Sequence, residues 1–399
     1  MNPYVNLRIV TLPFWRCSFD AVRAFERRAF TVNDSQHVVR SLVLVATGGA
    51  LLGKDGGMSE HDRGEFRDDI GRVALFGLGG TIASLPSGDT TAGVVPSVEA
   101  GTLVRSVPGL ESVARVESRT LRQMASANFS FADLIEISDA IRDAFSSGVD
   151  GVVVTQGSDN IEETSFAFDL LVDDERPVVV TGAMRNPSLP GADGPANVRA
   201  AVAVAVSPLA SGLGSLVVMN DEIHAARFVR KMHASSLSAF ASPQCGPIGV
   251  VVEGRVHFYA RVEPLTKARP QGDVAPVALV RCALADDGRM VSALVGLGYG
   301  GLVVEGFGGG HVPESMVEPL SELLLTMPIV LASRTGAGVV LESTYGFAGS
   351  EIDLRHRGLI SAGALDGAKS RVALALALAS TDNRAEAEAR FRDIVKTVG

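Results

Sequence analysis

The sequence predicts an α/β protein with two domains. We expect a larger N-terminal domain, with a mainly parallel sheet and helices on both faces, followed by a smaller C-terminal α/β domain. From Arg72 onward, short strings rich in Val, Ala and Leu alternate with longer segments of helical periodicity. These strings are apolar on both faces, which is typical of strands buried in a parallel sheet between helices.

The larger domain is expected over residues 71–254. Strands are predicted at 73–76, 151–155, 177–181, 214–219 and 249–252. Helices are predicted at 131–145 and 162–171. Ser158 or Asp159 lies near the start of the second helix, and acidic residues follow in its first turn, where they favour the helix dipole.

Beyond this domain the pattern loosens over residues 255–276, where three prolines and several charges indicate a linker. The C-terminal domain is expected over residues 277–399, with strands at 301–306 and 327–333 and helices at 313–325 and 368–380. Residues 1–70 read as an N-terminal extension of uncertain order.

The extension bears on the expected location of the protein. Its most apolar stretch, Ser41 to Leu52, has the composition of a short signal-peptide core, but forty residues precede it. No apolar stretch reaches the roughly 18 residues that span a bilayer. We therefore expect a cytoplasmic protein without a membrane partner, with export as the alternative if this stretch belongs to a signal segment.

Composition excludes several classes of function. Hydrophobic residues make up 46% of the chain and charged residues 20%, which fits a folded protein rather than a disordered one. A net charge of −9 argues against a nucleic-acid partner. The three cysteines are far apart, and no Cys/His cluster has the spacing of a metal site. We expect no metal and no organic cofactor.

Thr81 is the most informative candidate residue. The apolar string that begins at Val73 leads into Gly79-Gly80-Thr81, so a strand is followed by a glycine turn and then by a hydroxyl. Backbone N–H groups left free at such a turn attract a carboxylate or a developing oxyanion. The hydroxyl is therefore a candidate nucleophile.

Three further strings supply the groups that a hydroxyl nucleophile needs. The first, Thr155-Gln156-Gly157-Ser158-Asp159, again ends a strand at a glycine followed by a hydroxyl and a carboxylate, although simple helix capping also explains it. The second, at 181–197, contains Asp193-Gly194-Pro195, which we interpret as a turn scaffold. The third, at 220–233, is densely charged and by itself reads as a solvated helix face.

Together these strings resemble the bacterial-type L-asparaginase/glutaminase family. GGTIAS, TQGSDNIEET, TGAMRNP with ADGPAN, and NDEIHAARFVRKMH occur in the family's order and spacing. The resemblance covers roughly Arg72 to the C-terminus. It implies hydrolysis of a side-chain amide, with Thr81 as the nucleophile and Ser158, Asp159 and Lys231 as the set that moves its proton.

The resemblance also implies the substrate contacts and the assembly. Ser126 and Asp159 resemble the residues that bind the α-carboxylate and α-amino groups of an amino-acid amide. Glu351 loosely matches an acidic residue that a neighbouring subunit supplies. Because the family's sites borrow groups across a subunit boundary, we expect a homodimer or homotetramer.

This chain departs from the family at three positions. Ser158 stands where the family usually has threonine, so the methyl group that fixes the hydroxyl rotamer is missing. Val94 stands where a mobile loop normally contributes a tyrosine, and Tyr345 and His311 are our candidates to replace it. The family's Gly-Asn-Gly segment reads Gly308-Gly309-Gly310 here.

These departures keep several functions open. The leading hypothesis is an L-asparagine amidohydrolase with possible glutaminase side activity. An ammonia-supplying subunit of a tRNA-dependent amidotransferase and a non-catalytic amino-acid-binding homologue are the alternatives. A nucleotide-binding protein is disfavoured, because Ile82 occupies the place of the third glycine of a dinucleotide loop. One methylene separates asparagine from glutamine, and the sequence does not decide between them.

Overall fold

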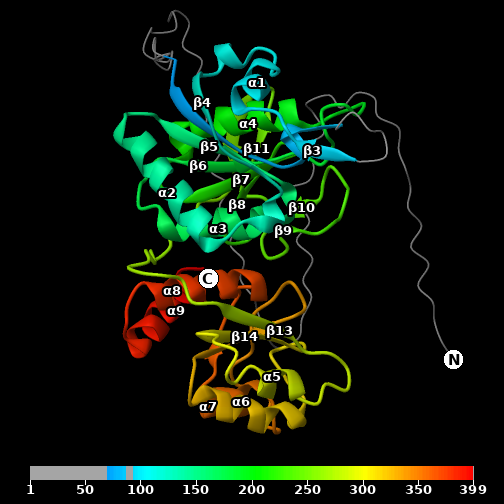
Figure 1. The fold of residues 1–399 in the computed structure, drawn as a ribbon, viewed down its shortest axis with the longest axis vertical. Coiled ribbons are helices and arrows are strands. Elements are labelled where there is room, and N and C mark those ends of the chain that lie inside the picture. Colours follow the sequence, from blue (N-terminus) through cyan, green and yellow to red (C-terminus); the bar gives the residue numbers. More distant parts are fainter. Residues whose placement is uncertain (1–69, 87–92, 399) are drawn as a thin grey trace, which may run out of the picture. The chain divides into compact units, whose positions relative to one another are not determined.

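A computed structural model describes residues 70–86 and 93–398, and the extension predicted at 1–70 lies outside this range except for its last residue. The larger sheet has eight strands in the order β12-β11-β8-β7-β6-β5-β1-β4 (Figure 1). In chain order these are β1 Arg72–Gly79, β4 Arg115–Met124, β5 Gly151–Thr155, β6 Val178–Thr181, β7 Ser215–Met219, β8 Glu222–Ala225, β11 Gly249–Val252 and β12 Arg255–Phe258.

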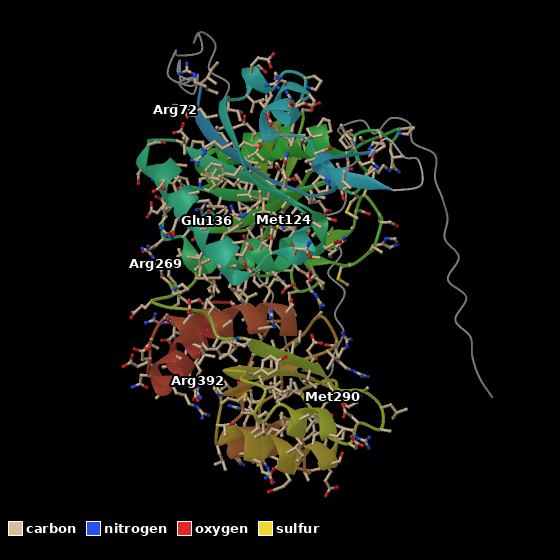
Figure 2. All side chains as sticks on the ribbon, viewed as in Figure 1. Arg72, Met124, Glu136, Arg269, Met290 and Arg392 are labelled. Atoms are coloured by element: carbon tan, nitrogen blue, oxygen red, sulfur yellow. The ribbon has the colours of Figure 1, made fainter. Side chains whose placement is uncertain are left out.

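The pairing of neighbouring strands changes once across this sheet, from parallel to antiparallel. The five strands from β7 to β4 are parallel, whereas β8, β11 and β12 pair antiparallel. Gly77 pairs with Thr120 on β4 and with Thr155 on β5. The register between β1 and β4 then shifts, so that Gly79 pairs with Met124, which Figure 2 labels. The carboxyl ends of these strands therefore lie at one edge of the sheet.

Helices cover both faces of the sheet, as predicted. The helices are α1 Ala100–Arg105, α2 Phe131–Ser146, α3 Ile161–Leu171 and α4 Gly194–Ala205. Alternate residues of each buried strand point to opposite faces. Phe76 and Val154 pack in one core cluster with α2 and α3, whereas Leu75 and Val153 pack in a second cluster with α1 and α4.

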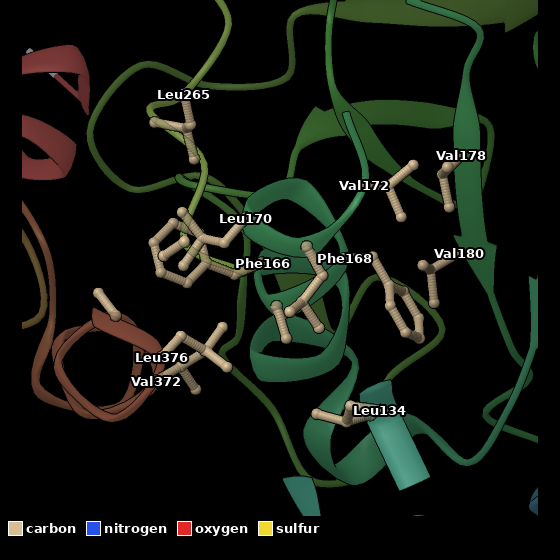
Figure 3. Packing of buried hydrophobic residues seen from close by; sticks show 14 of the residues in the cluster. Leu134, Phe166, Phe168, Leu170, Val172, Val178, Val180, Leu265, Val372 and Leu376 are labelled. Atoms are coloured by element: carbon tan, nitrogen blue, oxygen red, sulfur yellow. The ribbon is translucent and has the colours of Figure 1, made fainter. Parts of the chain in front are cut away.

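Helix α3 contributes side chains to the first cluster in two directions. Figure 3 shows Phe168 next to Val180 of β6, and Phe166 on the side that faces Val372 and Leu376. The last two residues belong to α8 Gly367–Ala379, in the C-terminal part of the chain. Helix α3 therefore packs against both the larger sheet and α8 through its own core residues. Burying one such side chain stabilises the fold by about 1.5–3 kcal/mol.

The C-terminal part contains a smaller parallel sheet in the order β13-β14-β15-β16. Its strands are β13 Val277–Arg281, β14 Gly301–Gly306, β15 Ile329–Ser333 and β16 Ile360–Ser361. Its helices are α5 Arg289–Ala293, α6 Val317–Leu324, α7 Glu351–Arg357, α8 and α9 Arg384–Val398. No helix in the described part of the chain has both the length and the apolar character needed to cross a membrane.

Several predicted elements differ from the structure. The strand predicted at 249–252 is β11, but it is not buried on both faces, because Val252 is 51% exposed on the antiparallel side of the sheet. The segment interpreted as a linker opens with β12. The charged string at 220–233 contains β8 and the two-residue strand β9, Arg230–Lys231, instead of a solvated helix.

Candidate active site

The candidate residues follow neighbouring parallel strands. Thr81 follows β1, Ser126 follows β4, and Ser158 follows β5, all at the carboxyl edge of the larger sheet. Ligands of open α/β sheets bind beyond this edge. The topology therefore brings three hydroxyl side chains, separated along the sequence, into one region.

The glycine turn before Thr81 depends on two residues with positive φ. Gly79 has a φ of 99° and Gly80 a φ of 79°, a region that favours glycine. A Cβ added at Gly80 would lie only 2.1 Å from the backbone nitrogen of Gly157. The absence of side chains at both glycines therefore lets the loop that carries Thr81 pack directly against the loop that carries Ser158.

Lys231 joins the second loop from a distant strand. Its Nζ donates a hydrogen bond to Ser158 Oγ at 2.9 Å and lies 2.8 Å from Asp159 Oδ1. The lysine side chain is 15% exposed, whereas that of Asp159 is 69% exposed. The structure thus brings together three of the four predicted catalytic residues in direct contact. Ser158 and Asp159 do not cap α3, because Asn160 occupies the N-cap position without a side-chain cap bond.

Ser126 lies beside the same loop. Asn160 Nδ2 donates to the backbone oxygen of Ser126 at 2.6 Å, which ties the two segments together. The Oγ of Ser126 is buried and has no hydrogen-bond partner among the described residues. It faces Gly157, since a Cβ there would lie 2.7 Å from this oxygen. A buried hydroxyl without a partner is costly, so it is available to a polar ligand group.

The Asp193-Gly194-Pro195 segment, interpreted from the sequence as a turn scaffold, is instead the start of α4, with Asp193 at the N-cap position and Pro195 in the first turn. The Asp193 carboxylate accepts the backbone N–H groups of Met184 and Arg185 at 2.9 Å each. Asn197 donates to the Gly182 oxygen at 3.0 Å and accepts from the Asn220 N–H. These bonds hold the loop after β6 in place at the sheet edge.

The charged string at 220–233 contributes buried groups that the sequence did not predict as buried. His224, on β8, is fully buried, and its Nδ1 lies 2.9 Å from Ser242 Oγ. Its Nε2 lies 3.2 Å from a carboxylate oxygen of Glu222. Burial lowers the pKa of His224 to about 4, so the imidazole is neutral near pH 7.

Glu351 does not join the other candidates within this chain. It is fully buried, and its Oε1 accepts the backbone N–H groups of Thr344 and Tyr345 at 2.8 and 2.7 Å. Its Oε2 lies 3.1 Å from His311 Nε2, and the His311 and Tyr345 rings pack edge to face at 4.9 Å. Within one chain Glu351 therefore organises a loop, and its role as a substrate contact stays a prediction.

Val94 begins the short strand β3, Val94–Pro96, which pairs with β2, Ser84–Pro86, just after Thr81. Its side chain is 40% exposed. Among the described residues, no contact of Tyr345 or His311 with Thr81 replaces the missing tyrosine.

Sequence reasoning missed the contact that holds the lysine backbone. Glu162 lies in the first turn of α3, as expected, and its Oε2 also accepts the backbone N–H of Lys231 at 2.6 Å. Burial is the main cause that raises the pKa of Glu162. The sequence cannot predict such a bond, because the acceptor binds a backbone N–H group that every residue except proline has.

Comparisons with known proteins agree with this architecture. Residues 72–264 match the family model of the asparaginase N-terminal domain, and residues 276–391 match the glutaminase/asparaginase C-terminal domain. An L-asparaginase of Bacillus licheniformis is 36% identical over 312 residues, which cover 77% of this chain and 96% of the relative. A glutaminase-asparaginase of Pseudomonas aeruginosa is 35% identical over 282 residues, covering 67% of this chain and 77% of the relative.

A solved structure shows the same fold. The crystal structure of a probable cytoplasmic L-asparaginase from Campylobacter jejuni has a TM-score of 0.72 and 32% identity, covering 81% of this chain and 99% of that one. The family models together span more than half of the chain. The chain therefore belongs to the bacterial-type L-asparaginase family.

Proposed function

We propose that this protein is an L-asparagine amidohydrolase that releases L-aspartate and ammonia through an ester formed on Thr81. The contact of Lys231 Nζ with both Ser158 Oγ and Asp159 Oδ1 carries this proposal. A hydroxyl is a weak nucleophile until a base removes its proton, and this trio places an amine next to a hydroxyl at the edge that also holds Thr81.

The reaction then proceeds in two stages. Ser158 takes the proton of Thr81 as Thr81 Oγ1 attacks the amide carbon, and it passes its own proton to Lys231 Nζ. The C–N bond breaks, the nitrogen leaves with the relayed proton as ammonia, and an acyl ester remains on Thr81. Water, deprotonated through the same relay, hydrolyses the ester to aspartate and restores the hydroxyl.

Two features support the stabilisation of the tetrahedral intermediate and the binding of substrate. We expect backbone N–H groups of the glycine turn at Gly79-Gly80 to stabilise the developing oxyanion, an effect commonly worth about 10²–10³ in rate. The buried Oγ of Ser126 is suited to donate to the substrate α-carboxylate, and the exposed Asp159 carboxylate is suited to bind the α-amino group.

The missing tyrosine makes the lysine relay the principal route for the Thr81 proton. Val94 offers no titratable group, so Ser158 and Lys231 act without aromatic help within one chain. Because Tyr345 and His311 do not contact Thr81 within the described part of one chain, we propose that a second copy supplies one of them for that role. We accordingly propose a homodimer or homotetramer with shared sites, to which Glu351 of the partner subunit also contributes.

Glutaminase activity is a second candidate function, since the relative from Pseudomonas aeruginosa is named a glutaminase-asparaginase. One methylene in the substrate changes discrimination by only about 1–3 kcal/mol, so both amides are candidate substrates. We propose a cytoplasmic location by analogy with the Campylobacter jejuni protein. The following experiment distinguishes a non-catalytic amino-acid binder from the amidohydrolase, and pull-down of a synthetase-like partner would identify an ammonia-supplying subunit.

The test is steady-state ammonia release from asparagine and from glutamine by the purified full chain. We expect Thr81→Ala to abolish turnover and Lys231→Ala to lower kcat by about 10²–10⁴-fold, both with an unchanged Tm. Activity at the wild-type level in Thr81→Ala would refute the proposed mechanism. Binding of asparagine without ammonia release by the wild-type protein would show a non-catalytic homologue.

A further inference from the structure

The backbone that carries Lys231 is held by two charged side chains. Its own N–H donates to Glu162 Oε2 at 2.6 Å, and two residues earlier the carbonyl of Val229 accepts from Lys369 Nζ, also at 2.6 Å. Glu162 belongs to α3 and Lys369 to α8. Strand β9 spans only two residues and pairs with the equally short β10, Phe240–Ala241, so its ladder alone gives little support.

The side chains of this clamp are themselves buried and paired. Lys369 is fully buried, and its Nζ lies 3.0 Å from Asp366 Oδ2. Arg230 Nε, from β9 itself, lies 3.7 Å from the same carboxylate oxygen. Charge-assisted bonds to backbone groups are roughly twice as strong as neutral ones. A buried ammonium that lost one of these partners would be costly, which fixes Lys369 in this position.

We propose that Glu162 and Lys369 are positioning residues for Lys231: they bind the backbone on both sides of Arg230, in β9 and just before it, and thereby hold Lys231 Nζ against Ser158 and Asp159. This inference rests on the proposed function of Lys231. Both clamp residues contact backbone groups and not the catalytic side chains. They act through the backbone of the segment that delivers the amine, and a displacement of about 1 Å at a reacting group costs on the order of 10² in rate.

Glu163 provides a matched control on the same helix. Like Glu162 it is a half-buried carboxylate in the first turn of α3, and burial raises the pKa of both. No hydrogen bond connects Glu163 to β9 in the described part of the chain. Its removal therefore takes away a similar charge from a similar place without opening the clamp.

The test compares three substitutions in the full chain by steady-state ammonia release. We expect Glu162→Ala to lower kcat by 10- to 100-fold with KM changed less than threefold. Glu162→Gln keeps an oxygen that accepts the Lys231 N–H, so we expect it to retain at least a third of wild-type kcat. Glu163→Ala should stay within twofold of wild type. Equal losses in Glu162→Ala and Glu163→Ala would overturn the proposal.

A mutant cycle and hydrogen exchange separate positioning from general damage. In a Lys231→Ala background, Glu162→Ala should leave the residual kcat within twofold, whereas a purely structural role lowers it as much as in wild type.

Hydrogen–deuterium exchange of the peptide 229–241 should be faster in Glu162→Ala and unchanged in Glu163→Ala. Unchanged exchange in Glu162→Ala would refute the positioning role alone. A wild-type rate in Lys231→Ala would refute the catalytic assignment as well.

The other arm of the clamp is tested by removing its two charges together. Lys369→Met alone leaves Asp366 buried without its ammonium, so we combine it with Asp366→Asn, which still caps α8 through its side-chain oxygen. We expect the double variant to fold and to lose at least 10-fold in kcat with little change in KM. Wild-type kcat in the folded double variant would show that Lys369 does not position Lys231.

Discussion

The contact between the two glycine turns makes Gly80→Ala a demanding test of the site geometry. A Cβ at Gly80 would lie 2.1 Å from the Gly157 nitrogen, so the loops of Thr81 and Ser158 must separate by roughly 1 Å to restore ordinary contact. A separation of that size predicts a loss of about 10²-fold in kcat/KM. The φ of 79° with a ψ of −175° lies in a region essentially restricted to glycine, which adds a backbone penalty of about 1–3 kcal/mol to the variant.

Gly298→Ala isolates the backbone penalty from the steric contact. Gly298 has a φ of 78°, and a Cβ there meets no described atom within 4 Å. Urea unfolding should therefore show a loss of about 1–2 kcal/mol in Gly298→Ala and a loss at least as large in Gly80→Ala. Ammonia release should fall only in Gly80→Ala. Wild-type kcat/KM in a folded Gly80→Ala protein would refute the close approach of the two loops.

Two further predictions concern Ser158 and His224. Ser158→Ala removes the hydroxyl that accepts a hydrogen bond from Lys231 and should lower kcat for ammonia release by about 10²–10⁴-fold. Ser158→Thr keeps a hydroxyl, so its kcat should stay within about threefold of wild type. Because the pKa of His224 falls from its ordinary value of 6.5 to about 4 on folding, the unfolded state binds its proton first, and stability is lost as pH falls from 6.5 towards 4. Urea unfolding measured at several pH values in this range should show that the free energy of unfolding falls with decreasing pH more steeply in the wild type than in His224→Asn. The difference in slope is at most about 1.4 kcal/mol per pH unit. Equal slopes would contradict a buried neutral imidazole.

The strands that could be predicted are those with a continuous apolar pattern. β5 and β14 were predicted at their observed bounds, because both faces of each strand are buried. β4 escaped prediction, since Arg115–Met124 lies at the edge of the sheet and exposes charged and polar side chains along its length. β8 was not predicted, because it is short and lies within a charged segment. It also runs antiparallel to β7, unlike the strands that were predicted in the parallel part of the sheet.

The site shows the same division. Thr81, Ser158 and Lys231 could be proposed from the sequence because their motifs carry recognisable side-chain types in a recognisable order. Glu162 and Lys369 were not found, because each acts on a backbone group that any residue provides. The contact of Ser158 with a lysine 73 residues away could be expected only from the resemblance to a known family, because the local sequence around Ser158 is equally compatible with helix capping.

The clamp on β9 also has a consequence for how the protein becomes active during folding. The bond between Val229 and Lys369 closes a loop of 140 residues, and such distant contacts form slowly because loop closure costs chain entropy. A nascent chain that ends before α8 therefore lacks one support of the lysine strand even when the larger sheet is complete. During refolding, ammonia release should therefore recover later than helical and sheet structure, because the lysine strand is fully supported only after α8 has docked.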